Sequence, residues 1–521
     1  MTSATELLAR YPRLAALALG VVAATGFPPL NLWPLTILSL AATIPLIRSA
    51  DSWRGVFLRG WLFGVGHFTL ANNWIATAFT YQAEMPSFLG WIAVPLLALY
   101  LAIYPALAFL AAWLVARRGP PLAMMAAFGA SWIVSEWLRS WVFTGYAWDP
   151  LGLALLGPWD RPGLAATLPW IGTYALSGLL VLLAGIVWLL VREQRWLPLG
   201  IVSALLAAGM YLPAGEAQQG SVRFTLVQPD LRQPELDDAS KFEEQFARIT
   251  DLTARRDVDG ERLVLWPESG VPDYLEDGYP QRYYDRMTAG GDPEFARARI
   301  AQVIGPQAML LTGAVNLDIE NGRAVSARNS VLAIDGDGAI TQSYAKAHLV
   351  PYGEYLALRW LLEPLGATRL VAGTIDFEPG PGPRSLALGR YGMAGIQICY
   401  EIVFSGQVVD RANRPDYIFN PSNDGWFGRF GPPQHLAQAR MRAIEEGLPV
   451  LRSTTTGISA VIDARGVVRQ HIGMHRADYI DGTIPPARAP TLFARAGNLL
   501  PLGWALLLLV LSLVASRRKH G

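Results

Sequence analysis

The chain has 521 residues, of which 52% are hydrophobic and only 16% are charged, whereas charged residues make up about 25% of an average soluble protein. This composition excludes a disordered chain, a coiled coil and an ordinary soluble enzyme. The net charge is +1, from 43 basic and 42 acidic residues, so no basic excess indicates a nucleic-acid partner. The single cysteine excludes an intrachain disulfide bond and a cysteine-ligated zinc site.

Long apolar stretches occupy both ends of the chain. A helix that crosses a bilayer needs about 20 mainly apolar residues. The sequence predicts a membrane domain over 1–213, a domain of ordinary soluble composition over 214–497, and a final membrane helix with a basic tail over 498–521. The first stretch could be a signal peptide, but because further apolar stretches follow directly, we interpret it as an uncleaved helix. The eight predicted spans are 13–27, 30–47, 57–76, 88–116, 121–140, 168–191, 196–213 and 499–516.

The connections between these spans differ in basic residues, which favour the cytoplasmic side of a membrane. The loops 28–29 and 77–87 contain no Lys or Arg, and the loop 141–167 contains only Arg161. The pattern predicts that both termini are cytoplasmic and that 214–497 lies on the outer side, which is the periplasm in a bacterium. The basic residues of the opposite connections are Arg10, Arg13, Arg48, Arg54, Arg59, Arg117, Arg118, Arg192, Arg195, Arg517, Arg518 and Lys519.

The 214–497 segment alternates between strand-like and helix-like patterns, which is typical of an α/β domain. Phe242, Phe246 and Ile249 recur at helical spacing, and 434–446 is a second helical stretch. The predicted strands are 222–227, 263–266, 308–315, 330–334, 393–399, 417–420 and 458–462.

Cys399 ends one of these buried-type strands, and polar residues follow it. A free cysteine is often simply a small buried hydrophobe. A lone thiol in an oxidising compartment is exposed to oxidation, however, so its presence there favours a chemical role. Its place at the carboxyl end of a strand is also where α/β proteins hold reactive groups.

Two charged residues lie in similarly apolar surroundings. Lys346 is one of only three lysines in a chain with forty arginines, and its compact ammonium can donate to an oxyanion or stabilise a thiolate. Glu268 follows an apolar strand and the pair Trp266-Pro267, where a desolvated carboxylate can act as a general base. Taken alone, Lys346 could be a surface lysine and Glu268 a capping or loop carboxylate.

Short motifs surround these three residues. They are Trp266-Pro267-Glu268, Lys346-x-His348-Leu349-Val350-Pro351-x-Gly353-Glu354, Cys399-Tyr400-Glu401, Ser422-Asn423-Asp424-x-Trp426-Phe427-Gly428, and Gln434-His435 followed by Ala439-Arg440-Met441-Arg442-Ala443. Together with the order Glu, Lys, Cys, these motifs resemble the nitrilase, or carbon–nitrogen hydrolase, superfamily. Within it, essentially the whole chain is similar to the membrane-embedded apolipoprotein N-acyltransferase family. The resemblance implies an α-helical membrane domain of about eight helices together with an α/β nitrilase-like αββα sandwich.

The resemblance also implies a role for each residue. Cys399 is the nucleophile, Glu268 is the general base, and Lys346 with the backbone N–H of Tyr400 stabilises the tetrahedral oxyanion. Where the family often has a tryptophan after the first strand, this chain has Leu236 or a neighbour, which puts a lid contact at that point in doubt. The supporting active-site positions are Glu354, Tyr400 and Glu401.

The implied reaction moves an acyl chain from a membrane phospholipid, through a Cys399 thioester, to the amine of S-diacylglyceryl-cysteine on an apolipoprotein. Two substrates that share one site in turn predict ping-pong kinetics. The partners are then the phospholipid donor, the apolipoprotein acceptor and the bacterial inner membrane. The sequence offers no metal-ligand cluster and no nucleotide-binding glycine loop, so it predicts no cofactor.

Three alternatives remain open from the sequence. A membrane-tethered nitrilase-type amidase that acts on small amides would need water access to the thioester. A transporter or receptor would tolerate Cys399→Ser and would carry paired charges along several membrane helices. A structural scaffold would leave the combination of Glu268, Lys346 and Cys399 without an explanation.

Several aromatic residues are candidates for lipid contact. One lies in the loop 143–149, where it could be an interfacial anchor or a wall of the acyl pocket. The others lie in the loop 423–433, for which we predict either a mobile apolar flap that contacts lipid or simple packing beneath the domain. These residues are Trp148, Trp426, Phe427 and Phe430.

One pair of charges lies inside a predicted membrane span. Glu136 and Arg139 are three residues apart, on one face of the helix. The sequence predicts either a structural ion pair or a contact with a lipid headgroup.

Overall fold

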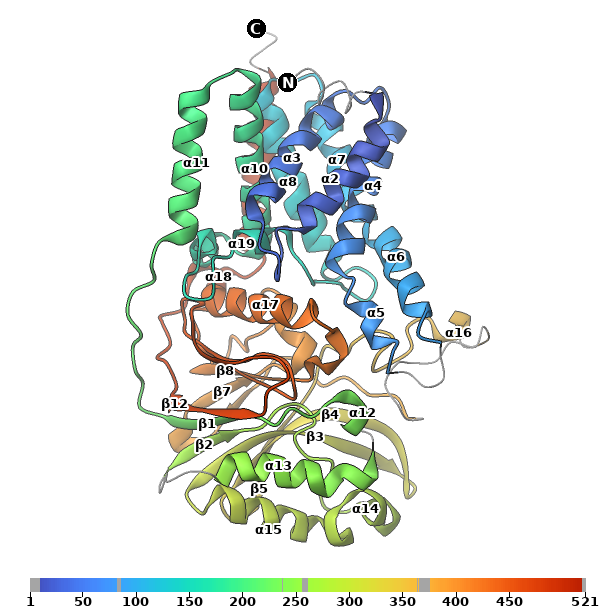
Figure 1. The fold of residues 1–521 in the computed structure, drawn as a ribbon, viewed down its shortest axis with the longest axis vertical. Coiled ribbons are helices and arrows are strands. Elements are labelled where there is room, and N and C mark those ends of the chain that lie inside the picture. Colours follow the sequence, from blue (N-terminus) through green and yellow to red (C-terminus); the bar gives the residue numbers. More distant parts are fainter. Residues whose placement is uncertain are drawn as a thin grey trace.

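A bundle of helices stands on an α/β unit of two sheets (Figure 1). The computed structural model describes residues 10–81, 86–236, 238–254, 261–362, 364 and 375–517. Helices from both ends of the described chain form the bundle, and the residues between them form the α/β unit. The bundle helices are α2 (Pro12–Ala24), α3 (Trp33–Arg48), α4 (Trp53–Ala71), α5 (Ile75–Ala78), α6 (Leu89–Leu101), α7 (Ile103–Ala116), α8 (Pro121–Arg139), α9 (Leu168–Ile171), α10 (Thr173–Arg192), α11 (Trp196–Tyr211), α18 (Leu492–Ala496) and α19 (Leu499–Arg517).

Three helical stretches in the described chain are long and apolar enough to cross a membrane. They are Leu89–Ala116, Thr173–Arg192 and Leu499–Arg517, whereas α2, α3 and α11 are apolar but shorter. Helices α4 and α8 have 19 residues each, but the charged residues that both contain lower their mean hydropathy. Three of the eight predicted spans therefore have the length and composition of a membrane helix, and the total of eight stays a prediction.

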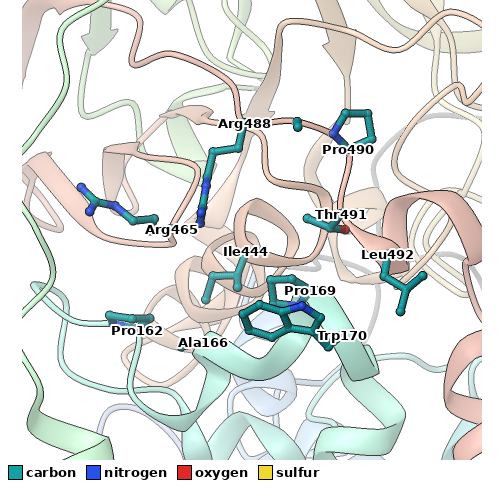
Figure 2. Close-up of a pocket in the computed structure, with 11 residues that line it drawn as sticks. Pro162, Ala166, Pro169, Trp170, Ile444, Arg465, Arg488, Pro490, Thr491 and Leu492 are labelled. Carbon is teal, nitrogen blue, oxygen red and sulfur yellow. The ribbon is translucent and has the colours of Figure 1, made fainter.

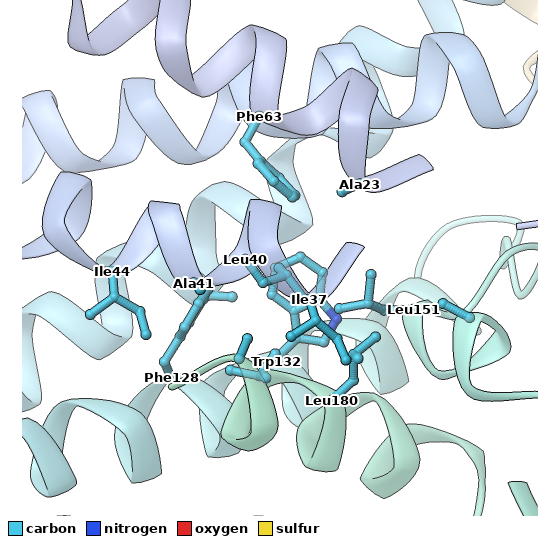
Figure 3. Close-up of a cluster of buried hydrophobic side chains, with 14 of the residues drawn as sticks. Ala23, Ile37, Leu40, Ala41, Ile44, Phe63, Phe128, Trp132, Leu151 and Leu180 are labelled. Atoms are coloured by element: carbon cyan, nitrogen blue, oxygen red, sulfur yellow. The ribbon is translucent and has the colours of Figure 1, made fainter. Parts of the chain in front are cut away.

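Small residues let two bundle helices approach closely. A β-carbon added at Gly20 of α2 would lie 1.9 Å from the Phe63 carbonyl oxygen of α4, and one at Gly66 of α4 would lie 2.2 Å from the Leu17 carbonyl oxygen. Such contacts are typical of helices that associate within a membrane. Phe63 and Trp132 belong to the buried apolar cluster in which α2, α3, α4, α8 and α10 meet (Figure 3).

The α/β unit contains two six-stranded sheets, with strand orders β12-β1-β2-β3-β4-β5 and β11-β10-β9-β8-β7-β6. Strands β1, β2 and β3 are parallel neighbours, as are β7, β8 and β9, so each group ends at one edge of its sheet. The strands are β1 (Arg223–Gln228), β2 (Arg262–Leu265), β3 (Ala308–Glu320), β4 (Arg323–Asp335), β5 (Ile340–Ala345), β6 (Ser385–Ala387), β7 (Met393–Ile396), β8 (Tyr417–Ser422), β9 (Val450–Thr454), β10 (Ser459–Ile462), β11 (Val468–Ile472) and β12 (Asp478–Thr483).

Helices cover both outer faces of the paired sheets. Helices α13 and α15 pack on the first sheet, on the side away from the bundle, and α17 lies between the second sheet and the bundle (Figure 1). This is the αββα layering that the resemblance implies. The helices of the unit are α12 (Gln233–Leu236), α13 (Phe242–Ala254), α14 (Gln281–Met287), α15 (Pro293–Ile304), α16 (Arg359–Leu362) and α17 (Gly431–Glu446), with short 3₁₀ helices that include η1 (Leu151–Leu155), η7 (Cys399–Val403) and η8 (Asp424–Phe427).

Helix α17 is polar yet almost entirely buried, because the bundle covers the face that the sheet leaves open. Near its end, the Glu445 carboxylate accepts hydrogen bonds from the backbone N–H (2.6 Å) and the hydroxyl (2.5 Å) of Thr173, where α10 begins. A negative charge at this position is favourable because the amino end of a helix is electropositive. Arg440 also donates to carbonyl oxygens of a bundle loop, at Gly157 (2.9 Å), Pro158 (2.7 Å) and Arg161 (2.8 Å).

Candidate active site

The three predicted residues come together in a buried cluster at the strand ends. Glu268 lies three residues beyond β2, Lys346 directly follows β5, and Cys399 lies three residues beyond β7. The three residues follow strands of both sheets and are 7%, 1% and 5% exposed, respectively. The Lys346 ammonium lies 3.7 Å from the Glu268 carboxylate, and both charges act on the pKa of Cys399. The structure therefore brings a thiol, a carboxylate and an ammonium into one site.

Lys346 is held mainly by Glu354, as expected for a carboxylate that assists the lysine. The Lys346 Nζ donates to Glu354 Oε1 at 3.0 Å, and the backbone N–H of Val350 donates to Glu354 Oε2 at 2.8 Å. Burial opposes the charge on Lys346, but the carboxylates of Glu354 and Glu268 outweigh it and raise the pKa of the lysine. Lys346 therefore stays a cation in a site that water does not screen.

Asn329, which was not among the predicted site residues, links the two carboxylates. Its side-chain Nδ2 donates to Glu268 Oε1 at 2.7 Å and to Glu354 Oε1 at 2.9 Å. Its backbone carbonyl oxygen accepts from the Lys346 backbone N–H at 2.8 Å. It lies within β4, not at a strand end, so its sequence position carries no mark of the site. Asn329 thus fixes the carboxylates on either side of the lysine.

We expect Asn329→Asp to lower the rate of acyl transfer by about 100-fold or more, the size of a lost general base. A third carboxylate would repel Glu268 and Glu354 and would remove the donor that orients them. Transfer to a diacylated peptide measures the effect. The control is Asn321→Asp, at an exposed turn between β3 and β4, which should transfer at the normal rate. Equal rates for the two variants would contradict the orienting role.

The second oxygen of Glu268 is also fixed. Its Oε2 accepts the backbone N–H of Asn423 at 2.7 Å, and the Asn423 side chain is itself held by Gln233 (2.8 Å) and Thr455 (2.8 Å). The segment after β8 therefore orients the carboxylate from the side opposite to Asn329.

Cys399 has a left-handed backbone conformation, with φ +50°, at the first residue of η7. A residue with a side chain adopts this region rarely, so its surroundings must hold it there. Burial raises the pKa of the thiol well above its usual value and the Glu268 charge adds to this shift, whereas Lys346 and the Asn423 backbone N–H oppose it. The resting thiol is therefore protonated and needs a base before it can attack.

Glu401 holds the cysteine turn against the segment after Lys346. Its carboxylate accepts hydrogen bonds from the backbone N–H groups of Ile398 (2.7 Å) and Ala347 (2.7 Å) and from the hydroxyl of Tyr344 (2.8 Å). Burial raises the pKa of Glu401 to about 7 against these donors. Glu401 lies at the site as expected, where it joins the two strands that carry the nucleophile and the lysine.

A buried histidine contacts the nucleophile from α17. His435 Nε2 lies 3.0 Å from the Cys399 carbonyl oxygen, which can only accept, so this nitrogen carries the hydrogen. Burial and the neighbouring Arg452 lower the pKa of His435, whereas Asp424 opposes this shift. Its Nδ1 lies 3.0 Å from a guanidinium nitrogen of Arg452 and 3.0 Å from Asp424 Oδ1. Asp424 binds the same guanidinium, with 2.7 and 2.8 Å contacts. This trio fixes the backbone of Cys399.

We expect His435→Phe to slow acylation of Cys399 by about tenfold to 100-fold, because a small displacement of the nucleophile has effects of this size. His435→Gln keeps an N–H donor and should recover part of the rate, a difference that loss of packing alone would not produce. Single-turnover acylation measures the rate, with His471→Phe on the exposed strand β11 as the control. No difference between the Phe and Gln variants would contradict the role of the hydrogen bond.

Aromatic side chains from the bundle and the α/β unit meet beside the nucleophile. Trp148 is fully buried and its ring stacks on Tyr400, with centroids 6.4 Å apart and planes 15° apart. Its burial rules out the interfacial-anchor alternative. Phe427 is also buried, with its centroid 5.5 Å from that of Trp148, whereas Trp426 and Phe430 are half-buried. The predicted 423–433 loop is partly helical, since it contains η8 and the first residues of α17, and its mobility stays a prediction.

Glu136 and Arg139 both lie in the described part of the chain, and they do not form the predicted ion pair. Glu136 Oε1 accepts from the backbone N–H of Leu151 at 2.7 Å, and Arg139 donates to the carbonyl oxygens of Trp148 (2.7 Å) and Asp149 (3.2 Å). The pairing prediction was wrong because helical spacing gives a shared face but does not identify partners. Both charges instead hold the loop that carries Trp148.

Comparisons with protein families divide the chain in the same order as the fold. Residues 19–186 match the apolipoprotein N-acyltransferase N-terminal domain, and residues 225–490 match the carbon-nitrogen hydrolase domain. A solved amidase of the nitrilase superfamily from Nesterenkonia AN1 aligns with 52% of this chain and 94% of its own, at 18% identity and a TM-score of 0.36.

Curated relatives match nearly the whole chain. The apolipoprotein N-acyltransferase of Rhodopseudomonas palustris is 34% identical, over 97% of this chain and 95% of its own. The enzyme of that name from Bradyrhizobium diazoefficiens is also 34% identical, with the same coverage, and that of Vibrio cholerae is 30% identical over 92% of each chain. These matches favour an N-acyltransferase over the amidase alternative. The chain therefore belongs to the apolipoprotein N-acyltransferase family of the carbon–nitrogen hydrolase superfamily.

Proposed function

We propose that this enzyme carries an acyl chain from a membrane phospholipid, as a thioester on Cys399, to the N-terminal amine of an S-diacylglyceryl-cysteine lipoprotein. The observation that carries the proposal is the buried meeting of Cys399, Glu268 and Lys346 directly beneath a bundle whose helices can cross a membrane. The names of the relatives support an acyl acceptor of the apolipoprotein class.

In the first half-reaction, Glu268 takes the thiol proton as the Cys399 sulfur attacks the ester carbonyl carbon of the phospholipid. The new C–S bond leaves a negative charge on the carbonyl oxygen, which Lys346 and the Tyr400 backbone N–H stabilise. The ester C–O bond then breaks, and Glu268 returns the proton to the departing oxygen. A lysophospholipid leaves, and the acyl chain remains on the sulfur.

In the second half-reaction, the lipoprotein amine attacks the thioester carbon. Glu268 takes a proton from the amine as the C–N bond forms, and Lys346 again stabilises the oxyanion. The C–S bond breaks and the proton passes to the sulfur, so the resting thiol is restored. Because one site serves both substrates in turn, the kinetics should be ping-pong.

The aromatic wall has a chemical purpose in this sequence of steps. A thioester that met water would lose its acyl chain by hydrolysis. The rings of Trp148, Tyr400 and Phe427 pack against one another next to the cysteine turn, and Trp426 and Phe430 are half-buried in the same segment as Phe427. We infer that these rings exclude water and contact the acyl chain.

The proposed setting is the bacterial inner membrane. The bundle over 1–213 and the helix within 498–521 cross the bilayer, with both termini in the cytoplasm, and the catalytic domain over 214–497 lies in the periplasm. The distribution of basic residues in the short connections supports this orientation.

Incubation with phospholipid alone tests the first half-reaction. Intact-mass analysis should find a gain of one acyl group, and hydroxylamine should remove it because a thioester is labile to this nucleophile. A diacylated lipopeptide added afterwards should take up the acyl group and restore the original mass. Release of free fatty acid in place of peptide acylation would identify a hydrolase and contradict the proposal.

A further inference from the structure

A cavity of about 460 Å³ lies where the bundle meets the α/β unit, and we call it the seam pocket. Figure 2 shows that side chains from both parts line it. Its lining includes Pro169, Trp170, Ile444, Arg465, Arg488 and Leu492.

The seam pocket is separate from the active site. Ile444, in its wall, lies nine residues beyond His435 on α17, which corresponds to about 14 Å along the helix. Of the active-site residues described above, none lines the seam pocket. The residues that line the seam pocket therefore differ from those that would hold the reacting ester.

Two tryptophans indicate the depth at which the seam pocket lies along the bundle. Trp170 precedes the start of α10 at Thr173 and is 61% exposed. Its carbonyl oxygen accepts from the indole N–H of Trp504 at 3.3 Å, near the start of α19. Both helices can cross a membrane, and tryptophan is enriched where such helices enter the headgroup layer. The seam pocket therefore lies at headgroup depth if the bundle is placed as proposed.

The two arginines of the pocket differ in their partners. Arg465 donates to the carbonyl oxygens of Gly215 (3.0 Å) and Glu216 (2.6 Å), and it lies 3.6 Å from Asp463. Arg488 is exposed and makes no ion pair with any residue that the structure describes. Its side chain extends from the backbone toward Ile444, whereas the Arg465 guanidinium points away from the centre (Figure 2). The seam pocket thus presents one uncompensated cation above apolar walls.

We propose that the seam pocket binds an anionic phospholipid of the outer leaflet that is not a substrate. The lipid phosphate pairs with Arg488, and the glycerol and first acyl carbons lie against Trp170 and the half-exposed Leu492. This inference rests on the membrane placement in the proposed function. A guanidinium over an apolar floor fits an anionic amphiphile better than a free ion, because only the amphiphile fills both parts.

The lipid would contact both parts of the protein at once. Trp170 belongs to the bundle, whereas Arg488 belongs to the α/β unit. Ile444 is next to Glu445, whose carboxylate binds the start of α10. A ligand that bridges two parts binds only when they are docked, so it stabilises the docked state by mass action. Bound lipid should therefore raise the temperature at which the full-length protein unfolds.

The test counts lipids bound to the full-length Cys399→Ala protein, in which donor turnover is blocked. Native mass spectrometry would compare phosphatidylglycerol with phosphatidylcholine. We expect Arg488→Gln to weaken one phosphatidylglycerol site by about tenfold or more, as befits a lost charge-assisted hydrogen bond. Arg488→Lys should weaken it less. The matched control is Arg286→Gln, on the exposed face of α14 at the membrane-distal end, which should bind normally.

Other outcomes separate the alternatives. Ala166→Trp keeps Arg488 but fills the pocket, so it too should lose the site. Unchanged lipid counts in both pocket variants would overturn the proposal. Equal loss of phosphatidylcholine would show that charge is not recognised, and full competition by inorganic phosphate would assign a phosphate site in place of a lipid site. Because the Cys399→Ala protein cannot turn over, a failed acyl transfer would leave these results unaffected.

Discussion

Replacing Cys399 with alanine should abolish acyl transfer, with a loss of at least about 10³-fold in rate, as for other enzymes without their nucleophile. No other cysteine exists in the chain to take its place. Intact-mass analysis after incubation with phospholipid should show no acyl adduct, and a diacylated lipopeptide should remain unacylated. The reaction depends on the sulfur because Glu268 and Lys346 are arranged around it and cannot form a thioester themselves.

Folding provides the control for this variant. Cys399 is buried, and the change to alanine removes a single sulfur atom, so the free energy of unfolding should fall by only about 1–2 kcal/mol. Thermal unfolding of the variant and of the unchanged protein in one detergent would measure the difference. Cys399→Ser retains a hydroxyl of similar shape and should also fail, since a hydroxyl is a much weaker nucleophile at neutral pH. Turnover in a well-folded Cys399→Ala protein would refute nucleophilic catalysis by this residue.

Replacing Lys346 with arginine should lower the transfer rate by about 10²- to 10³-fold, the effect of removing one oxyanion donor. The charge is kept, but the shape is not. Lys346 is 1% exposed, and its ammonium lies between Glu354 at 3.0 Å and Glu268 at 3.7 Å. A planar guanidinium is larger and would pair with these carboxylates through both of its ends, so it would not leave a donor for the substrate oxygen.

The matched control is Lys241→Arg, because Lys241 is exposed and pairs with Glu244 at the surface. That variant should transfer acyl chains at the normal rate. Burst measurements with phospholipid would separate a defect in acylation from a defect in substrate binding. A Lys346→Arg protein with near-normal acylation would show that the lysine acts only as a counter-charge to the carboxylates.

The structure places the three predicted residues Glu268, Lys346 and Cys399 in one buried cluster, and their catalytic roles stay a prediction. Glu268 and Cys399 could be found because each follows or ends an apolar run, whereas Lys346 follows the polar strand β5 and stood out only as one of three lysines. Asn329 escaped notice because a polar residue within a half-buried strand looks like a solvent-facing position. Its inward orientation depends on how β4 pairs with β5, a register that the sequence does not specify.

Some strands of the fold were predicted from the sequence and others were not. All seven predicted strands are present, although the 393–399 strand ends at Ile396, where the turn to Cys399 begins. Strands β5, β6, β9, β11 and β12 were missed, and β9 illustrates the reason. It contains Arg452, a charge that normally argues against a buried strand but is accommodated here by Asp424. Whether such a segment forms a strand depends on pairing with residues far away in the sequence. The periodicity of a short segment carries no information about that pairing.

The dual attachment of α17 limits how this enzyme can be dissected or recombined. A fragment cut at residues 214 and 497 would expose Arg440 and Glu445 without the carbonyl and amide groups that now satisfy them. Such a fragment should aggregate, since α17 has no solvent-facing side of its own. A chimera of two homologous enzymes would need to take the loop 157–161 and the start of α10 from the same parent as α17.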